Sequence, residues 1–541
     1  MTSADAWWKH GIIYQIYPRS FRDANNDGNG DLAGIIEKLD YLRDLGVDGI
    51  WLSPINQSPM YDCGYDISDY DHIDPMFGSD EDFDRLVKEA DKRRIKIVMD
   101  LVLAHTSHLH PWFLESRLWT DSPKRDWYIW RGPKNGGYPN NWRSAFGGRG
   151  WTFDEKTRQY YHHQFLPEQP QLNWLNPDVR KALFEMIRRW LDRGVGGFRL
   201  DVVNYFFKDE HLRDNPFRLG PNPRPYDLQA HVNDGNRPET HEALREFRDI
   251  LNQYPGTMSV GEVWFEAPGN PAEAAKYYGS NDELHLVFDF AMVHLKKWKA
   301  EKFFKAVMTW ERLVPDDGWP TWTLGNHDQW RMMTRLGKKD GWERMRLLAV
   351  LLLTLRGTPF LYYGDEIGMR NGLLKRGDLV DPVGQRYWPF HIGRDPARTP
   401  MQWTSATGAG FTRASKTWLP LAPDYGTVNV QAQESDAGSL LHFYRRLIAV
   451  RRERPSLNQG TFRPLLDGRN GVLAWLREHE SERALVVLNF KPEPAMASPG
   501  APGNWVSVFS THRANGSAFE LPVTRLAPYE ASIFVDAATG D

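Results

Sequence analysis

The sequence predicts a (β/α)₈ barrel that carries a long insertion and is followed by a small all-β domain. Eight short apolar runs lie between Ile12 and Tyr363, and amphipathic helical stretches separate them. Short buried strands that alternate with helices are typical of parallel α/β folds, and eight such strands close a barrel. The chain has 541 residues, which is enough for an expanded barrel and two further units.

The eight apolar runs are four to six residues long and rich in Ile, Leu, Val, Phe and Trp. Continuous apolar runs of this length are expected of parallel strands that are buried on both faces. The predicted strands are Ile12–Tyr17, Gly49–Leu52, Lys96–Leu101, Gly197–Asp201, Met258–Val263, Leu284–Phe288, Thr321–Leu324 and Pro359–Tyr363.

Helices are predicted between these strands. Apolar residues recur at helical spacing from Leu32 to Leu45, and Gly46 supplies a stop signal. A later helix begins with Asn176 as the N-cap and Pro177 at the first helical position, and it runs to Gly194. These signals place helices where crossover connections of a barrel are needed.

Two regions interrupt the alternation, and a third follows it. Thr106–Asn173 is rich in Trp, Gly, Pro and Asn and is interpreted as an insertion after the third strand, while Gly364–Gln402 is an excursion after the eighth. After a helix at Ser439–Arg452, strands such as Ala484–Phe490 and Val506–Phe509 alternate with turns. The expected domains are a barrel over residues 1–105 and 174–458, an inserted domain over 106–173, and a C-terminal β-sandwich over 459–541.

Composition and charge exclude several classes of protein. With 67 basic and 70 acidic residues the net charge is −3, so the basic footprint of a nucleic-acid-binding protein is absent. The most apolar run, Leu347–Leu355, is too short to cross a bilayer, and Met1–His10 lacks the features of a secretory signal. Cys63 is the single cysteine, which is typical of a reducing compartment. We expect a cytoplasmic protein with neither a nucleic-acid nor a membrane partner.

Acidic residues stand at the ends of four predicted strands. They are Asp100, Asp201, Glu262 and Asp328. The chemistry of (β/α)₈ barrels takes place at the C-terminal ends of the strands, so these carboxyls are better candidates for catalysis than the acids on helices.

Two of these carboxyls have neighbours that suit different roles. Arg199 and Asp201 are two apart on a strand and therefore share a face, and the guanidinium favours an ionised Asp201, as a nucleophile requires. Glu262 has apolar and aromatic neighbours that raise a carboxyl pKa, as an acid catalyst requires. One ionised and one protonated carboxyl are the groups that cleave a glycosidic bond. The alternative is a pair of ordinary salt bridges at strand ends.

Seven segments resemble the motifs of the α-amylase superfamily (glycoside hydrolase family 13), in its α-glucosidase and oligo-1,6-glucosidase branch. Their order and spacing match that family over nearly the whole chain. The segments are GIIYQIYPRSF at Gly11–Phe21, GYDISDY at Gly64–Tyr70, DLVLAH at Asp100–His105, GFRLDVVN at Gly197–Asn204, GEVW at Gly261–Trp264, GNHD at Gly325–Asp328 and GRDPARTPMQW at Gly393–Trp403.

The resemblance implies catalytic roles for three of the strand-end acids. Asp201 would be the nucleophile, Glu262 the general acid and base, and Asp328 a third carboxylate that grips sugar hydroxyls in the transition state. The mechanism would be a double displacement with retention of configuration, which needs the two reacting carboxyls about 5–5.5 Å apart.

The resemblance also implies eight substrate-binding side chains. Two histidines would bind the non-reducing glucose, an arginine would orient the nucleophile, and a tyrosine would form a stacking platform. An Asp–Arg pair would close the far end of the pocket, and two phenylalanines of the insertion would wall the cleft. In that order the residues are His105, His327, Arg199, Tyr65, Asp62, Arg394, Phe146 and Phe165.

The function implied is that of a retaining, exo-acting α-glucosidase that releases glucose from short α-glucosides of the maltose or isomaltose type, with transglucosylation activity. Its partner would be a small neutral oligosaccharide, and the protein would be a monomer or homodimer. The alternatives are a sucrose isomerase or another glucosyltransferase on the same fold, and a non-catalytic sugar-binding protein. The last is disfavoured because all three carboxylates are present.

The linkage is left open by two conflicting signals. Val202 follows the nucleophile and resembles enzymes that accept α-1,6 links, whereas Thr or Ala there resembles strict α-1,4 enzymes. Lys208–Pro216 instead resembles a branch with α-1,4 and transglucosylating members. Glu262-Val263-Trp264 argues against a trehalose synthase.

A candidate metal loop follows the first strand, with oxygen-bearing side chains at alternate positions. It begins like an EF-hand loop, but Gly34 stands where the bidentate glutamate would be, so it is not an EF-hand. The alternative is a polar, Gly-rich turn. The family resemblance favours a structural Ca²⁺ (or Mg²⁺), and no organic cofactor is expected. The implied ligands are Asp23, Asn25, Asp27, Asn29 and Asp31.

Other metal sites are disfavoured. Ala104 and Gln171 depart from the common family pattern, which weakens the case for calcium at the boundary between barrel and insertion. His105, His108 and His110 lack the spacing and the acidic or cysteine partners of a zinc site.

Overall fold

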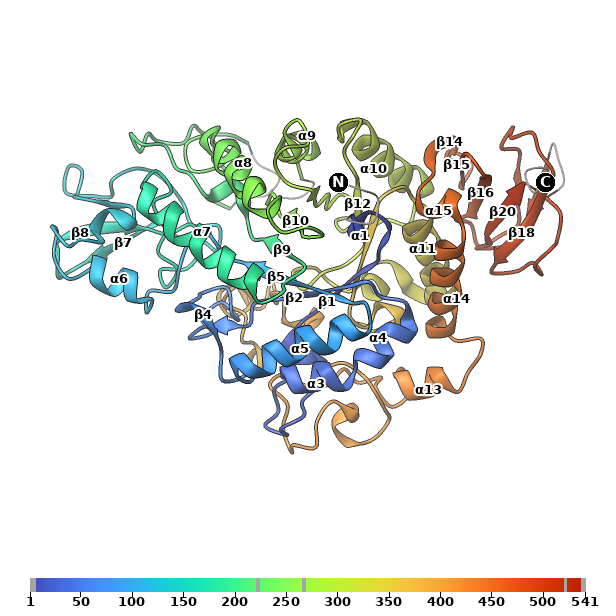
Figure 1. Ribbon diagram of the computed structural model, residues 1–541, viewed down its shortest axis with the longest axis horizontal. Coiled ribbons are helices and arrows are strands. Elements are labelled where there is room, and N and C mark those ends of the chain that lie inside the picture. The colour runs from blue at the N-terminus through green and yellow to red at the C-terminus, as the bar shows by residue number, and fades with distance from the viewer. Residues whose placement is uncertain (1–5, 220–223, 265–268, 520–522, 537–541) are drawn as a thin grey trace.

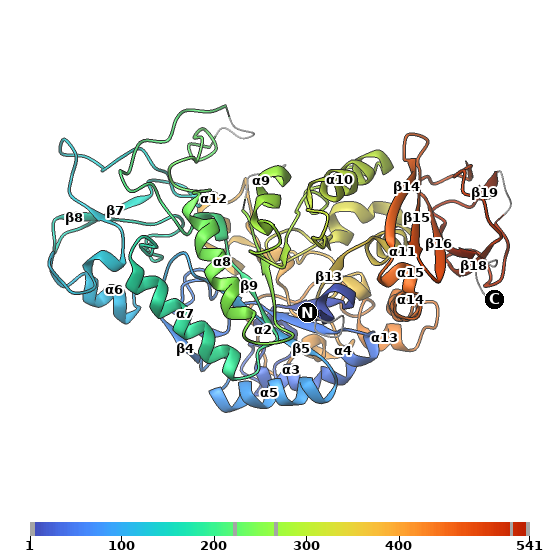
Figure 2. The ribbon, with the colours of Figure 1, turned by 45° about the horizontal axis from the view of Figure 1, so that its top comes forward.

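The computed structural model describes residues 6–219, 224–264, 269–519 and 523–536. A parallel sheet surrounded by helices occupies the middle of the molecule. The sheet of the insertion, with β7 and β8, lies at one end, and the red C-terminal sheet lies at the other end in both views (Figures 1 and 2).

Eight parallel strands form the central sheet, as the sequence predicts. Their order, β11-β10-β9-β5-β2-β1-β13-β12, follows the chain around the barrel. Between the two end strands, the hydroxyl of Thr321 donates to the carbonyl of Val287 (2.6 Å). The strands are β1 Ile13–Ile16, β2 Gly49–Leu52, β5 Lys96–Leu101, β9 Gly197–Leu200, β10 Met258–Gly261, β11 Leu286–Val287, β12 Thr321–Thr323 and β13 Thr358–Tyr362.

The barrel interior contains its own buried cluster. Ile13, Trp51, Val98, Met258 and Phe360 come from strands around the sheet and pack together. The interior of such a barrel is filled by layers of side chains, so polar residues one layer closer to the C-terminal ends are presented to the active-site face. The alternation along each strand therefore decides which acids reach that face.

The long helices surround the sheet. Asn176 caps one of them by accepting the N–H of Asp178 (2.9 Å), and Gly46 ends another with φ 97°, as predicted. The single helix expected before Gly46 is instead two, because Lys38 leaves the helical conformation (φ −107°, ψ 4°). The long helices are α3 Leu32–Glu37, α4 Leu39–Leu45, α5 Asp80–Lys92, α7 Pro177–Asp192, α8 Glu239–Leu251, α10 Ala300–Leu313, α11 Gly341–Thr354 and α14 Leu440–Glu453.

Short helices and strands occupy the connections. The helices are α1 Trp7–His10, α2 Pro18–Phe21, α6 Pro111–Ser116, α9 Pro271–Ala275, α12 Pro382–Tyr387, α13 Val430–Glu434 and α15 Pro455–Asn458. The strands are β3 Asn56–Gln57 and β4 Asp69–Ile73, which pair with each other, and β6 Trp130–Arg131, β7 Trp151–Asp154 and β8 Gln159–His162, which form the antiparallel sheet of the insertion.

The C-terminal region is all-β. Its main antiparallel sheet has the order β14-β15-β16-β20-β18, and β17 pairs with β19. The indole of Trp298 donates to the carbonyl of Phe490 (2.7 Å) and Arg477 donates to the carbonyl of Thr354 (2.7 Å), so this region is hydrogen-bonded to the segment before α10 and to the end of α11. The strands are β14 Thr461–Asp467, β15 Val472–His479, β16 Glu482–Asn489, β17 Ala495–Ala497, β18 Trp505–Ser510, β19 Thr524–Leu526 and β20 Ala531–Asp536.

Within the described ranges, none of the helices has both the length and the apolar character needed to span a membrane.

Candidate active site

A buried guanidinium joins three of the strand-end acids. Arg199 lies on β9, and its side chain is 1% exposed. Its Nη1 donates to Oδ1 of Asp100 and to Oδ1 of Asp201, each at 2.8 Å, and its Nη2 donates to Glu262. Asp201 and Glu262 follow β9 and β10 directly, so the ends of two adjacent strands bring the two carboxyls to one cation, on the shared face that the sequence predicts.

The pKa values of this pair differ in part from the sequence expectation. Burial raises the pKa of Glu262, as expected, but it also raises the pKa of Asp201 well above its ordinary value, although Arg199 lowers both. Burial is the largest cause of the shift in Asp201, and the charge of Glu262 and a hydrogen bond between the two carboxyls raise its pKa further. Such a hydrogen bond requires a proton, and two adjacent carboxyls cannot both ionise easily.

Asp328, in the loop after β12, is surrounded by two guanidiniums and an imidazole. Its Oδ1 accepts from Nη2 of Arg398 (2.9 Å) and Nη1 of Arg394 (3.4 Å), and its Oδ2 lies 3.5 Å from Nε2 of His327. Burial alone would raise its pKa, but these neighbours together lower it below the ordinary value. Asp328 is therefore ionised at neutral pH and can accept hydrogen bonds from hydroxyls.

A salt bridge joins two loops beside this carboxylate. Nη2 of Arg394, from the excursion after β13, lies 2.6 Å from Oδ1 of Asp62 in the loop after β3. The guanidinium also lies over the ring of Phe146, 5.1 Å from its centroid. The Asp62–Arg394 pair expected from the sequence is thus formed, and Phe146 of the insertion packs against it.

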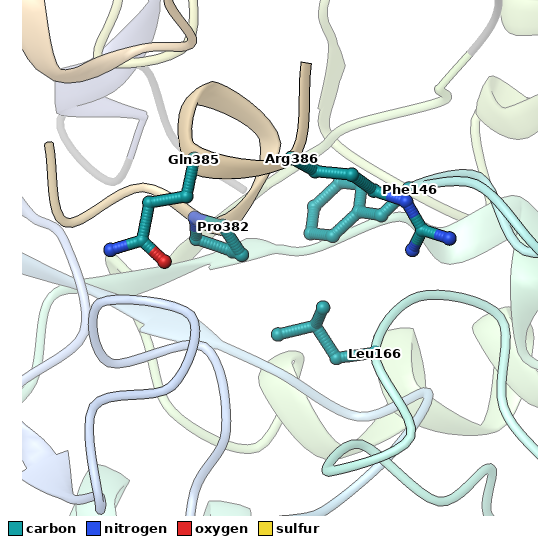
Figure 3. A pocket seen from close by; sticks show the side chains of 5 residues that line it. All are labelled: Phe146, Leu166, Pro382, Gln385 and Arg386. Atoms are coloured by element: carbon teal, nitrogen blue, oxygen red, sulfur yellow. The ribbon is translucent and has the colours of Figure 1, made fainter. Parts of the chain in front are cut away.

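A cavity of about 350 Å³ adjoins this wall (Figure 3). Phe146 and Leu166 line it from the insertion, and Pro382, Gln385 and Arg386 line it from α12. The cavity therefore lies between the insertion and the excursion after β13.

His327 belongs to a hydrogen-bonded chain that ends at Asp100, one of the carboxylates bound to Arg199. Nε2 of Gln15 lies 2.8 Å from Nδ1 of His327, and Nε2 of His327 lies 2.7 Å from the hydroxyl of Tyr65, which donates to Oδ2 of Asp100 (3.0 Å). With the Gln15 amide in this orientation, His327 carries its proton on Nε2. Burial lowers the pKa of His327 to about 3, so it is neutral at pH 7.

Tyr65 and His327 also stack, with ring centroids 5.4 Å apart and planes inclined by 7°. The tyrosine is therefore held rigidly by its ring and by its hydroxyl, as a sugar-stacking platform must be.

His105 lies after β5, beside the insertion. Its Nε2 is 2.9 Å from the carbonyl of Tyr65, and its ring centroid is 5.5 Å from that of Phe165. Burial lowers the pKa of His105 to about 4. Nε2 of Gln169 lies 3.0 Å from Nε2 of His105 and donates to Oδ2 of Asp62 (3.1 Å), so one amide links the histidine to the closing pair.

All eleven predicted catalytic and substrate-binding residues are thus joined in one cluster by hydrogen bonds, ion pairs or ring contacts. Residues that the sequence reasoning left without a role also belong to it. Asp100 and Gln15 lie next to the last residue of a barrel strand, which was a usable signal, whereas Gln169 and Asp381 lie in long loops that carry no periodicity. The added residues are Gln15, Asp100, Gln169, Asp381 and Arg398.

The candidate metal residues lie apart from this cluster. Asp23 accepts the N–H groups of Asn26 (2.6 Å) and Gly28 (2.8 Å), and Asp31 caps α3 by accepting the N–H of Gly34 (2.6 Å). Across the described part of the chain, no three His, Cys, Asp or Glu side chains converge as metal ligands do.

The donor chemistry of this loop still suits a hard cation. A carboxylate has about four lone-pair sites, and each of these turn hydrogen bonds uses one of them. The side-chain oxygen of Asn29 accepts from Nε of Arg19 (2.8 Å), so Asn29 would contribute through its backbone carbonyl, which is the contribution of position 7 in such loops.

Known proteins similar to this chain were found by sequence and by structure. The family model for the catalytic domain of alpha-amylase matches residues 15–460. A probable alpha-glucosidase of Rhizobium meliloti is 40% identical over 98% of this chain and 93% of its own length. An oligo-1,6-glucosidase of Parageobacillus thermoglucosidasius is 39% identical, with 98% of each chain covered.

Solved structures similar to this chain come from related enzymes. The structure of an alpha-glucosyl transfer enzyme superposes with a TM-score of 0.92 at 41% identity and covers 98% of this chain and 99% of its own. A trehalulose synthase of Pseudomonas mesoacidophila superposes with a TM-score of 0.88 at 34% identity over 98% and 99% of the two chains. The chain therefore belongs to the α-amylase family of glycoside hydrolases, in the branch of the α-glucosidases and oligo-1,6-glucosidases.

Proposed function

We propose that the protein is a retaining, exo-acting α-glucosidase that releases glucose from the non-reducing end of short, neutral α-glucosides. The observation that carries this proposal is the pair Asp201 and Glu262, bound by one guanidinium and hydrogen-bonded to each other. Carboxyls in such contact are much closer than the roughly 6.5–9.5 Å that an inverting enzyme needs for its water.

The hydrogen bond between the two groups, which raises the pKa of Asp201 and lowers that of Glu262, requires one proton on the pair. One proton on the pair is the number that a double displacement needs, because one carboxyl must attack and the other must protonate the leaving oxygen. Asp201 attacks the anomeric carbon and Glu262 protonates the glycosidic oxygen, which breaks the bond and leaves a covalent glucosyl-enzyme. Glu262, now ionised, then takes a proton from water, and the incoming oxygen displaces Asp201. A second sugar in place of water gives transglucosylation.

The other residues of the cluster bind the glucose. Asp328 is ionised and accepts hydrogen bonds from sugar hydroxyls, while the neutral imidazoles of His105 and His327 contact the glucose without adding a buried charge. The Asp62–Arg394 pair closes the far end of the pocket, which supports exo-action, because a chain that continued beyond the terminal glucose would meet it.

A product assay on maltose, isomaltose, sucrose, trehalose and maltotriose tests the function. NMR of the first product distinguishes α-glucose, expected from retention, from β-glucose, which contradicts it. Glu262→Gln and Asp201→Asn should each reduce kcat by about 10²–10⁴-fold or more, because each removes an acid, base or nucleophile but little volume. The matched control is Glu246→Gln, the same chemical change on a helix side chain that is 44% exposed. Native-like turnover by either active-site variant refutes the assignment.

A second candidate function is sucrose isomerisation. It is favoured by the trehalulose synthases among the similar structures. Incubation with sucrose alone separates the two functions: an isomerase gives isomaltulose or trehalulose with little free glucose, whereas a hydrolase gives glucose and fructose in equal amounts.

We also propose a structural Ca²⁺ (or Mg²⁺) held by Asp23, Asn25, Asp27, the carbonyl of Asn29, and Asp31. Its support is the hard-oxygen donor set and the family resemblance. The cation would stabilise the loop between β1 and α3, and no catalytic step involves it.

A cytoplasmic location, and a monomeric or homodimeric state, complete the proposal. A free, buried Cys63 supports a reducing compartment. Cell fractionation and light scattering of the purified protein test the two statements separately.

A further inference from the structure

Asp381 is fully buried and holds both the backbone and the side chain of Arg394. Its Oδ2 accepts the backbone N–H of Arg394 (2.6 Å), and its Oδ1 accepts from Nη2 (2.8 Å) and Nε (3.2 Å). Oδ1 also accepts the N–H of Val383 (3.2 Å), so the same carboxylate caps α12. A single side chain thus ties a partly exposed helix next to the cavity to a largely buried arginine of the candidate site.

Arg394 must reach two other carboxylates from this position. Nη2 also contacts Oδ1 of Asp62 (2.6 Å), while Nη1 points to Oδ1 of Asp328 (3.4 Å). A guanidinium is a rigid planar fork, so its rotation about the side chain decides whether both ends are reached together. The hydrogen bonds that Nε and Nη2 of Arg394 donate to Asp381 set that rotation, because they hold one edge of the plane.

Asp395 and Gly393 hold the backbone around Asp381 in the conformation that this contact needs. Oδ2 of Asp395 accepts the N–H groups of Val380 (2.7 Å) and Asp381 (2.8 Å), so the two segments hold each other reciprocally. Gly393 has φ +72°, and a Cβ there would lie 2.3 Å from Oδ2 of Asp381. Only glycine avoids both the strain and the collision at this position.

We propose that Asp381 is a positioning residue of the glucose-binding site, which fixes Arg394 in the orientation that contacts Asp62 and Asp328 at once. The identity of the ligand as glucose rests on the proposed function. Without this carboxylate the guanidinium can rotate away, so the far end of the pocket opens and Asp328 loses one of its cations.

The ionisation of Asp381 and Arg394 is consistent with this positioning role. Burial works against the charged form of Arg394, and Asp381 is the carboxylate that does most to raise its pKa well above the ordinary value. Burial would also raise the pKa of Asp381, but Arg394 lowers it to about 2, so the ion pair is complete at neutral pH.

The test is Asp381→Asn, which keeps the size but places an NH₂ donor against the backbone N–H or the guanidinium of Arg394. Glucose affinity, measured by calorimetry, should fall by about tenfold or more, and KM should rise by about tenfold or more, with a smaller change in kcat. The acid limb of kcat/KM should move to higher pH, because Asp328 is then easier to protonate. Asp381→Glu, which restores the charge, should recover part of the loss.

The matched control is Asp378→Asn, the same change three residues away, where the carboxylate accepts the N–H of Lys375 (2.8 Å). It should leave affinity, KM and the pH profile at native values. A double-mutant cycle with Arg394→Gln adds a further criterion: if Asp381 acts through Arg394, its substitution has little further effect in that background.

Three results would overturn the proposal. They are native glucose affinity and an unshifted pH profile in a folded Asp381→Asn variant, an undiminished effect of this substitution without Arg394, and a crystal structure of the variant in which Arg394 keeps its contacts with Asp62 and Asp328. The crystal structure of the variant, and a double-mutant cycle in which thermal stability is measured, test the positioning role without any activity assay. A native protein that cleaves no glucoside would refute the proposed function but would leave these two tests valid.

Should Asp381→Asn fail to fold, Asp381→Glu takes its place. The longer side chain must displace the guanidinium and weaken glucose binding, and native binding would contradict the proposal.

Discussion

Nη1 of Arg199 lies 2.8 Å from Oδ1 of Asp201, and the same nitrogen lies 2.8 Å from Oδ1 of Asp100. The candidate nucleophile is thus held through one arginine by an acid from the neighbouring strand. One guanidinium can hold three buried carboxyls because the pKa values of Asp201 and Glu262 are both raised, so this pair retains a proton.

Replacing Arg199 by Lys should reduce kcat/KM by about 10²-fold. Lysine keeps the positive charge but is a single point donor, so it cannot orient Asp201 and Glu262 from opposite ends of a fork. Steady-state kinetics on 4-nitrophenyl α-glucoside measures the change, and Arg158→Lys, at a side chain that is 75% exposed, is the matched control. Activity within threefold of native would show that charge alone suffices.

The carboxylates of this site were predictable because they end strands. Regular alternation places Arg199 and Asp201 on one face, and the sheet register then brings Asp100 beside Arg199. The fold was also predictable from its strands, because buried parallel strands have a continuous apolar pattern.

Loop-borne partners were not predictable in this way. Asp381 and Gln169 sit in excursions whose path depends on tertiary contacts, and neither has a periodic neighbour that indicates its direction. The raised pKa of Asp201 was also missed, because the sequence shows its cation, Arg199, but not how completely the fold buries this carboxyl beside Glu262 of the adjacent strand.

The residue after the nucleophile has an unusual backbone. Val202 is buried at φ 38° and ψ 51°, a left-handed conformation that costs a β-branched residue about 1–2 kcal/mol. Such strain persists only where the surroundings enforce it, and here it follows the end of β9 next to Asp201.

Val202→Thr should change linkage preference with little effect on folding. Thr is also β-branched, so the backbone strain is unchanged, but a methyl becomes a hydroxyl on the residue that follows the candidate nucleophile. From the family resemblance we expect the ratio of kcat/KM for isomaltose to that for maltose to fall at least severalfold. Competition between the two disaccharides, followed by chromatography, measures this ratio directly. An unchanged ratio would move the determinant of linkage to other loops.

Removing divalent cations should lower the thermal stability of the protein if the loop at Asp23–Asp31 binds one. Dialysis against a chelator should lower Tm by several degrees, and a small excess of Ca²⁺ should restore it, because a ligand bound to the folded state stabilises it by mass action. In Asp27→Ala, whose carboxylate is largely exposed, the chelator should have much less effect. Equal Tm values for native protein with and without chelator would contradict the metal site.

Buried histidines should make the protein sensitive to acid, and His110 allows a test away from the candidate active site. Its ring is buried, and Nδ1 accepts the N–H of Trp112 (3.1 Å) as the N-cap of α6. Burial lowers the pKa of His110 to about 3, against about 6.5 in the unfolded chain. As the pH falls from 6.5 towards 3, the unfolded state binds a proton that the folded state does not, so stability is lost over that window.

His110→Asn should flatten this loss. The amide oxygen of Asn can still accept the N–H of Trp112, but the side chain no longer titrates. The variant loses ring packing and should be less stable at pH 7. Its free energy of unfolding should nevertheless fall by about 2–3 kcal/mol less than that of the native protein between pH 7 and pH 4. Urea unfolding at a series of pH values gives this difference, and His211→Asn, at an exposed position, should follow the native curve. Parallel pH curves for native protein and His110→Asn would mean that His110 is protonated in the folded state, so its burial would not contribute to acid sensitivity.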